Sequence, residues 1–139
     1  VIDRNECTDY AEFGRGGYII SDSESSPDIT IIATGSEVSL ALDAKRELSE
    51  FNIRVVNLGC WELFEEQAED YKKTVIDDDS YLVSVEAGIT TGWQKYTGKN
   101  GLNIGIDRYG ESAPGKVVAE HLGMSVQNIV DQIRKNFKK

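Results

Sequence analysis

The sequence contains few of the side chains from which metal and redox sites are built. Its 139 residues include one histidine, two cysteines and one methionine. Cys7 and Cys60 are far apart without metal-ligand spacing, and His121 completes no zinc set. We therefore expect no metal site, and we interpret the cysteines as two reduced thiols in a cytoplasmic protein.

Long apolar runs and concentrated positive charge are also missing. No run approaches the roughly 18 residues that a membrane-spanning helix needs, so we expect no membrane span and see no signal peptide. Acidic residues outnumber basic ones by 24 to 15, which gives a net charge of −9. A nucleic acid would be repelled by this field, and the basic tail at 134–139 suits the C-terminal end of a helix. The composition therefore argues against nucleic acid binding.

The length and the hydrophobic content of 40% suit a single domain. Residues 1–15 are polar and irregular, and we interpret them as a linker tail. The folded domain is predicted at 16–139. Since the chain begins at Val1 and its only methionine is Met124, we expect the natural protein to be longer at its N-terminus.

Short apolar runs predict a five-stranded sheet. They span residues 18–21, 29–33, 53–58, 81–85 and 102–106. The middle three are rich in Ile, Val and Leu and alternate only weakly, which is typical of strands covered on both faces in a mostly parallel sheet. Only the seven residues 22–28 separate the first two runs, too few for a parallel crossover. The first strand is therefore predicted to run antiparallel, in a mixed sheet with helices on both faces.

Apolar residues at helical spacing predict a helix after the second strand and another at the C-terminus. Ser36 is the predicted N-cap of the former and Ser125 of the latter. Met124 and Ile129 occupy the positions of a hydrophobic staple, and Gly123 is placed to end a preceding helix.

The turn at 34–37 joins a predicted strand to a predicted helix, where free backbone N–H groups can bind a phosphate. It lacks the spacing of a dinucleotide fingerprint or a P-loop. Glu37 also places a carboxylate at the positive end of the helix dipole. We therefore prefer helix capping, with anion binding as the alternative.

Glu86 follows the fourth strand, at the edge where open α/β sheets usually bind ligands. It could act as a general base or as an acceptor at an interface. No histidine or second carboxylate lies near it in the sequence, so we favour a hydrogen-bonded structural role. Trp93 and Tyr96 follow at helical spacing and are expected to pack in the core or to form an interface patch.

The stretch 105–114 is unusually charged for a turn. Arg108 could bind a carboxylate or phosphate, pair with a neighbouring domain, or be solvated; the interdomain pair is preferred. His121 is interpreted as a surface or capping residue near a helix end. No G-x-S-x-G elbow is present. The sequence offers no self-contained active site, and we assign no catalytic, cofactor-binding or metal-binding residue.

Six segments in order carry a family resemblance. They are GGY (16–18), IATGSEV (32–38), WELF (61–64), VEAG (85–88), GW (92–93) and DRYGESAP (107–114). This set resembles the third, C-terminal domain of transketolases from about Gly16 to Lys135. The resemblance implies a three-layer α/β/α sandwich with strand order 1-3-2-4-5. Alternatives are the related domains of deoxyxylulose phosphate synthase and of 2-oxo acid dehydrogenase β-subunits, and a free-standing anion-binding α/β module.

The resemblance also implies an activity for a longer parent enzyme. Such enzymes move a two-carbon ketol unit from a ketose phosphate to an aldose phosphate in the pentose phosphate pathway, with thiamine diphosphate and a divalent cation, Mg²⁺ or Ca²⁺. The family's Gly-Asp-Gly diphosphate motif and its active-site histidines are absent here. In the family they belong to the two preceding domains, across a dimer interface.

We therefore expect this chain to be inactive alone and to have an architectural role. It is predicted to contact the preceding domains of the same enzyme and to support a homodimer, with the cofactor and the sugar phosphates bound elsewhere. Glu86, Trp93, Arg108 and Tyr109 are the predicted interface residues.

Overall fold

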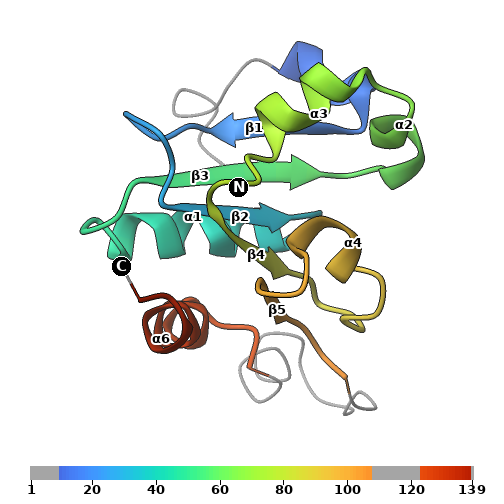
Figure 1. The fold of residues 1–139 in the computed structure, drawn as a ribbon. Coiled ribbons are helices and arrows are strands. Elements are labelled where there is room, and N and C mark those ends of the chain that lie inside the picture. Colours follow the sequence, from blue (N-terminus) through green and yellow to red (C-terminus); the bar gives the residue numbers. More distant parts are fainter. Residues whose placement is uncertain (1–9, 108–122, 139) are drawn as a thin grey trace.

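The computed structural model describes residues 10–107 and 123–138 and contains a five-stranded sheet between two layers of helices (Figure 1). The strands are β1 (Gly17–Ser21), β2 (Ile29–Ala33), β3 (Ile53–Leu58), β4 (Tyr81–Val85) and β5 (Leu102–Ile104). Their order across the sheet is β1-β3-β2-β4-β5. The pairs β3–β2, β2–β4 and β4–β5 are parallel, whereas β1 is antiparallel to β3. The predicted strand directions and order are confirmed.

Helices cover both faces of the sheet. One layer consists of α1 (Glu37–Glu47) and α6 (Val126–Asn136), and the other of α2 (Trp61–Glu65), α3 (Glu69–Val75) and α4 (Gln94–Thr97). A 3-10 helix, η2 (Tyr10–Arg15), precedes β1. Residues 10–15 of the predicted linker therefore form a helical turn, while residues 1–9 lie outside the described part. Within the described ranges no helix is long and apolar enough to span a membrane.

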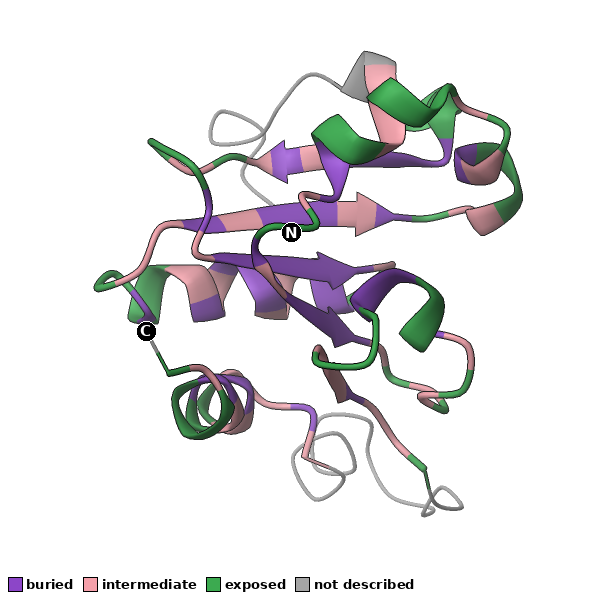
Figure 2. Ribbon diagram, viewed as in Figure 1, coloured by how far each residue is buried: buried purple, intermediate pink, exposed green. Residues whose placement is uncertain are grey.

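Each face of the sheet has its own apolar core, because successive strand residues point to opposite sides. Ile31 and Val55 pack in the cluster that includes Ile133 of α6, while Ile32 and Val56 pack in the cluster of Phe64 and Trp93. All five residues of β2 are buried, as the weak alternation predicted (Figure 2).

The helix caps match the prediction at α6 and differ at α1. Ser125 Oγ accepts a hydrogen bond from the Asn128 N–H at 3.2 Å, which confirms that cap. Ser36 is at the N-cap position of α1, as predicted, but it has helical backbone angles and makes no capping bond: its hydroxyl donates to Glu37 Oε1 at 2.7 Å instead. Gly123 has a φ of +84°, which suits the end of a helix; the helix predicted before it lies outside the described residues.

The last predicted strand is shorter than its apolar run. It ends at Ile104 rather than at residue 106. Beyond it, the Ile106 N–H donates to Gly88 O at 2.7 Å, so the chain leaves the sheet ladder to hold the loop that follows β4.

Candidate functional site at the carboxyl edge of the sheet

The loops after β2 and β4 lie at the point where the chain connections of the sheet diverge. From β2 the chain crosses through α1 to β3 on one side, and from β4 it crosses through α4 to β5 on the other. Crevices at such switch points are the usual ligand sites of open α/β sheets. We therefore take this carboxyl edge as the candidate site.

Two glutamates lie close enough at this edge to interact electrostatically. Glu37, at the start of α1, is 8% exposed and accepts the Ser36 hydroxyl, and Glu86 at the end of β4 is partly buried. Burial raises the pKa of Glu86, and the nearby charge of Glu37 raises it further. Spacing along the chain does not reveal this pair, because Glu37 and Glu86 are far apart in the sequence. Pairing of β2 with β4 in register could have indicated it, since both residues follow those strands.

The loop that follows Glu86 is held in place from β5. Thr90 donates to Asp107 twice, from its N–H to Oδ1 at 2.8 Å and from its hydroxyl to Oδ2 at 2.9 Å. These two bonds, the backbone one first, lower the pKa of Asp107 below its usual value. Together with the bond from Ile106 to Gly88, they give the loop a fixed shape.

Gly105 is required for this arrangement. A Cβ atom added there would lie 2.7 Å from Gly88 O and 2.7 Å from Thr90 Cγ2. Both distances are too short for a side-chain carbon, so a larger residue would push the two segments apart. Ile89 lies in the loop thus held, with 66% of its surface exposed.

Trp93, predicted as an interface residue, lies inside the domain. Its ring packs edge-on against Trp61 with centroids 5.0 Å apart, and Trp61 also packs against Tyr96 at 5.1 Å. Only 3% of Trp93 is exposed. The residue therefore has almost no surface left for a partner, and its ring packs in the core on that face of the sheet instead. This corrects the interface assignment.

Of the other three predicted interface residues, the structure describes only Glu86. Glu86 lies at the edge, as expected. Arg108, Tyr109 and also His121 lie outside the described residues, so their interface and capping roles stay predictions.

The described residues do not fit thiamine diphosphate or its metal ion. No group of three or more His, Cys, Asp or Glu side chains among them could hold a metal. At the switch point, Glu37 and Glu86 present negative charge, which opposes a diphosphate. We therefore assign them no step of cofactor chemistry.

A hollow of about 220 Å³ between α3 and α4 is a second place where an anion could be sought. Two of its three lysines, however, are paired within the domain: Lys72 lies 2.7 Å from Glu69, and Lys95 lies 3.0 Å from Glu65. Tyr96 donates to Glu65 at 2.9 Å in the same group. Most of the positive charge that lines the hollow is therefore compensated within the domain.

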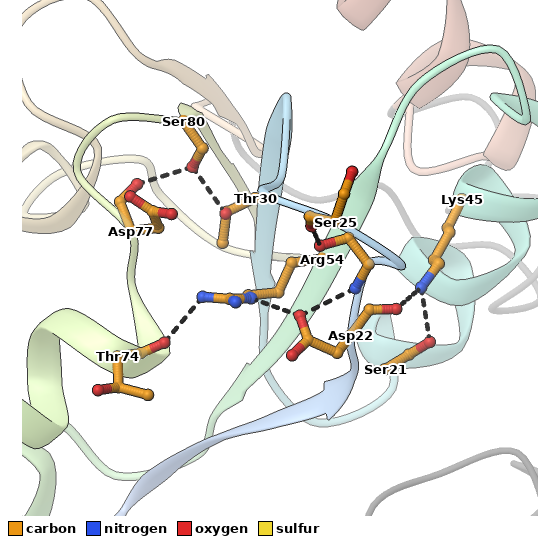
Figure 3. Close-up of polar contacts among 10 residues, drawn as sticks. Ser21, Asp22, Ser25, Thr30, Lys45, Arg54, Thr74, Asp77 and Ser80 are labelled. Atoms are coloured by element: carbon orange, nitrogen blue, oxygen red, sulfur yellow. Dashed lines mark hydrogen bonds and ion pairs between the residues drawn. The ribbon is translucent and has the colours of Figure 1, made fainter.

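The opposite, amino edge of the sheet is fastened by polar contacts (Figure 3). Arg54 donates to Asp22 Oδ1 at 2.8 Å and to the carbonyl oxygen of Thr74 at 2.7 Å. Lys45 donates to Ser21 Oγ at 2.9 Å and to the carbonyl oxygen of Asp22. Burial acts to raise the pKa of Asp22, but the bonds from Arg54 and the Ser23 N–H outweigh it and lower the pKa overall. These contacts tie the β1–β2 reversal to α1, β3 and α3.

Comparison with known proteins identifies the family. Residues 16–125 match the model of the transketolase-like TK C-terminal domain. The transketolase of Aquifex aeolicus is 46% identical over 135 residues, which cover 95% of this chain and 20% of that protein. The transketolase of Bacillus subtilis is 39% identical over 137 residues, which cover 96% and 20%.

A solved structure agrees in fold. Transketolase from Leishmania mexicana superposes with a TM-score of 0.85 at 35% identity, over 93% of this chain and 19% of that one. The present chain thus spans about a fifth of the length of the relatives that it matches. It belongs to the transketolase-like C-terminal domain family.

Proposed function

We propose that this chain is the C-terminal, architectural part of an enzyme that transfers a two-carbon ketol unit from a ketose phosphate to an aldose phosphate. The observation that carries the proposal is the family match over residues 16–125, together with relatives named as transketolases that are about five times longer. Thiamine diphosphate and a divalent cation would supply the carbanion chemistry from the other domains of a homodimer.

The charge of this domain supports the placement of the cofactor and the sugar phosphates in the other domains. Its net charge is −9, and its switch point carries two glutamates. Sugar phosphates and a diphosphate cofactor are anions, and an acidic surface does not attract them. The domain is instead well packed. At the carboxyl edge of its sheet, Glu86 makes no side-chain hydrogen bond to the described residues, which suits contact with a neighbouring domain. Glu86, Arg108 and Tyr109 are the residues that we place at this contact.

A domain replacement tests the proposal. The segment of the Aquifex aeolicus transketolase that matches this chain is exchanged for the present 139 residues, and ketol transfer between a ketose phosphate and an aldose phosphate is measured with thiamine diphosphate and Mg²⁺. We expect transfer by the chimera and none by the isolated chain. The same relative with the segment deleted is the control.

Two results would contradict the proposal. One is a folded chimera that binds the cofactor but transfers no ketol unit. The other is tight binding of thiamine diphosphate and Mg²⁺ to the isolated chain in calorimetry, since that would place the cofactor site within this domain.

A further inference from the structure

The turn between α4 and β5 contains the only asparagine–glycine pair of the sequence, Asn100 and Gly101. Residues 98–101 connect the end of α4 at Thr97 to the start of β5 at Leu102 (Figure 1). The turn lies at the amino edge of the sheet, because β5 begins here and runs parallel to β4. Glycine after asparagine is common in turns, and it also places an unhindered backbone nitrogen beside a side-chain amide.

Asn100 can change its conformation at little cost in free energy. Its side chain is exposed, and neither its amide nor the N–H of Gly101 makes a hydrogen bond to any described residue. A Cβ atom added at Gly98, earlier in the same turn, would have no atom within 4 Å, so the turn borders on open space. Rearrangement of such a turn breaks few contacts, and segments of this kind open most readily in folded proteins.

Water can reach the pair from a hollow at this edge. The hollow has a volume of about 400 Å³ and opens to solvent, and Lys99, Asn100 and Gly101 are among its lining residues. A reaction between the two adjacent groups that needs water to complete it is therefore not hindered by burial.

Asn136 provides a contrast within the same chain. It is also exposed, but its Nδ2 donates to Gln132 O at 2.8 Å. The N–H of the residue that follows it, Phe137, donates to Ile133 O at 2.8 Å. Both groups that would have to react are thus engaged in hydrogen bonds, and the side chain of Phe137 hinders their approach. Asn100 differs from it in both respects.

We propose that Asn100 is a site of spontaneous deamidation. The backbone nitrogen of Gly101 gives its proton to water or hydroxide and attacks Asn100 Cγ, so that a new C–N bond forms. The bond from Cγ to Nδ2 breaks, and ammonia leaves with a proton from the solvent. The succinimide ring then takes up one water at either of its carbonyl carbons and opens to aspartate or to isoaspartate. Water is the only co-reactant, because the two reacting groups belong to adjacent residues.

The isoaspartate product should loosen the start of β5. Its main chain runs through the side-chain carbon, which adds a methylene to the backbone before Gly101. There is little room for this extra length: a Cβ atom added at Gly101 would lie 2.7 Å from Leu82 O and would also meet Thr97 O. Leu82 belongs to β4, with which β5 pairs. The aspartate product, in contrast, changes only the charge of an exposed side chain.

Ageing of the intact chain at neutral pH tests the proposal. Samples are digested at intervals, and asparagine, aspartate and isoaspartate at positions 100 and 136 are quantified by chromatography and mass spectrometry. We expect Asn100 to convert at least about tenfold faster than Asn136, which corresponds to a barrier lower by about 1.4 kcal/mol, and to convert faster still at alkaline pH. Asn100→Gln is the matched variant, since it keeps an amide but would have to close a larger ring.

Equal rates at the two asparagines overturn the proposal. Conversion of Asn100 in denaturant but not in the folded chain also overturns it, because the fold would then protect the pair. The melting temperature of the aged chain should fall by a few degrees, and that of aged Asn100→Gln should not change. An unchanged melting temperature in a sample rich in isoaspartate contradicts the loosening of β5. None of these results depends on ketol transfer, so they do not test the proposed function.

Discussion

The amino and carboxyl edges of the sheet use their polar and apolar side chains in opposite ways. At the amino edge, Arg54 and Lys45 are paired with Asp22 and Ser21 within the domain. At the carboxyl edge, Glu86 has no side-chain hydrogen bond to the described residues and Ile89 is exposed. The contacts at the amino edge lie within the domain and stabilise the fold. At the carboxyl edge, the carboxylate of Glu86 and the apolar side chain of Ile89 are left for a neighbouring domain to contact. The contrast is consistent with the proposal that the carboxyl edge serves contact with a neighbouring domain, while the amino edge serves stability.

The largest effect is expected at the bracing of the carboxyl edge. Gly105→Ala should lower the free energy of unfolding by about 2 to 3 kcal/mol, because its Cβ would meet backbone and side-chain atoms at 2.7 Å. Chemical denaturation of the isolated chain measures the change. Gly59→Ala, at the same edge, is the control: its Cβ would have no neighbour nearer than 3.7 Å, so a change within about 0.5 kcal/mol is expected. Equal effects of the two substitutions would show that the loop is not braced as described.

A smaller loss is expected at the amino edge. Arg54→Met keeps the apolar stem of a side chain that is only 13% exposed but removes its bonds to Asp22 and Thr74. We expect a loss of about 1 to 2 kcal/mol in the free energy of unfolding. Lys99→Met, at an exposed turn position, is the control and should change the free energy of unfolding by at most about 0.5 kcal/mol. If Arg54→Met were as mild as Lys99→Met, the contacts of Arg54 would not stabilise the amino edge.

The smallest effect is a gain at Glu86. Burial and the charge of Glu37 raise the pKa of Glu86 above its ordinary value of 4.5, so the folded state opposes ionisation. The stability associated with this group is complete below pH 4.5 and is lost as the pH rises through the raised pKa. Glu86→Gln should therefore increase the melting temperature at pH 7, and the gain should disappear below pH 4.5.

Thermal unfolding at several pH values, with the exposed Glu66→Gln as the control, measures this difference. A loss of stability in Glu86→Gln at pH 7 would show that the carboxylate already has a partner within the domain. It would then remove Glu86 from the contact surface.

The sequence predicted the site less well than the fold. The placement of Glu86 at the carboxyl edge followed from its position after a buried strand. Trp93 was misassigned because helical spacing does not reveal which side of a short helix faces the core, and here that side packs on Trp61. Ile89 was missed because a single apolar residue in a loop has no periodicity. Its exposure, and the hydrogen bonds that the neighbouring Thr90 donates to Asp107, are visible only in the tertiary structure.

The sequence by itself determined the strands, their directions and the C-terminal helix with its Ser125 cap. These features depend on local patterns: apolar runs, the length of the 22–28 turn, and a hydroxyl at the start of a helix. Tertiary structure alone decided which loops meet, since Glu37 and Glu86 become neighbours only through the pairing of β2 with β4. It also decided which apolar residues stay exposed, because burial depends on contacts between segments that are distant along the chain.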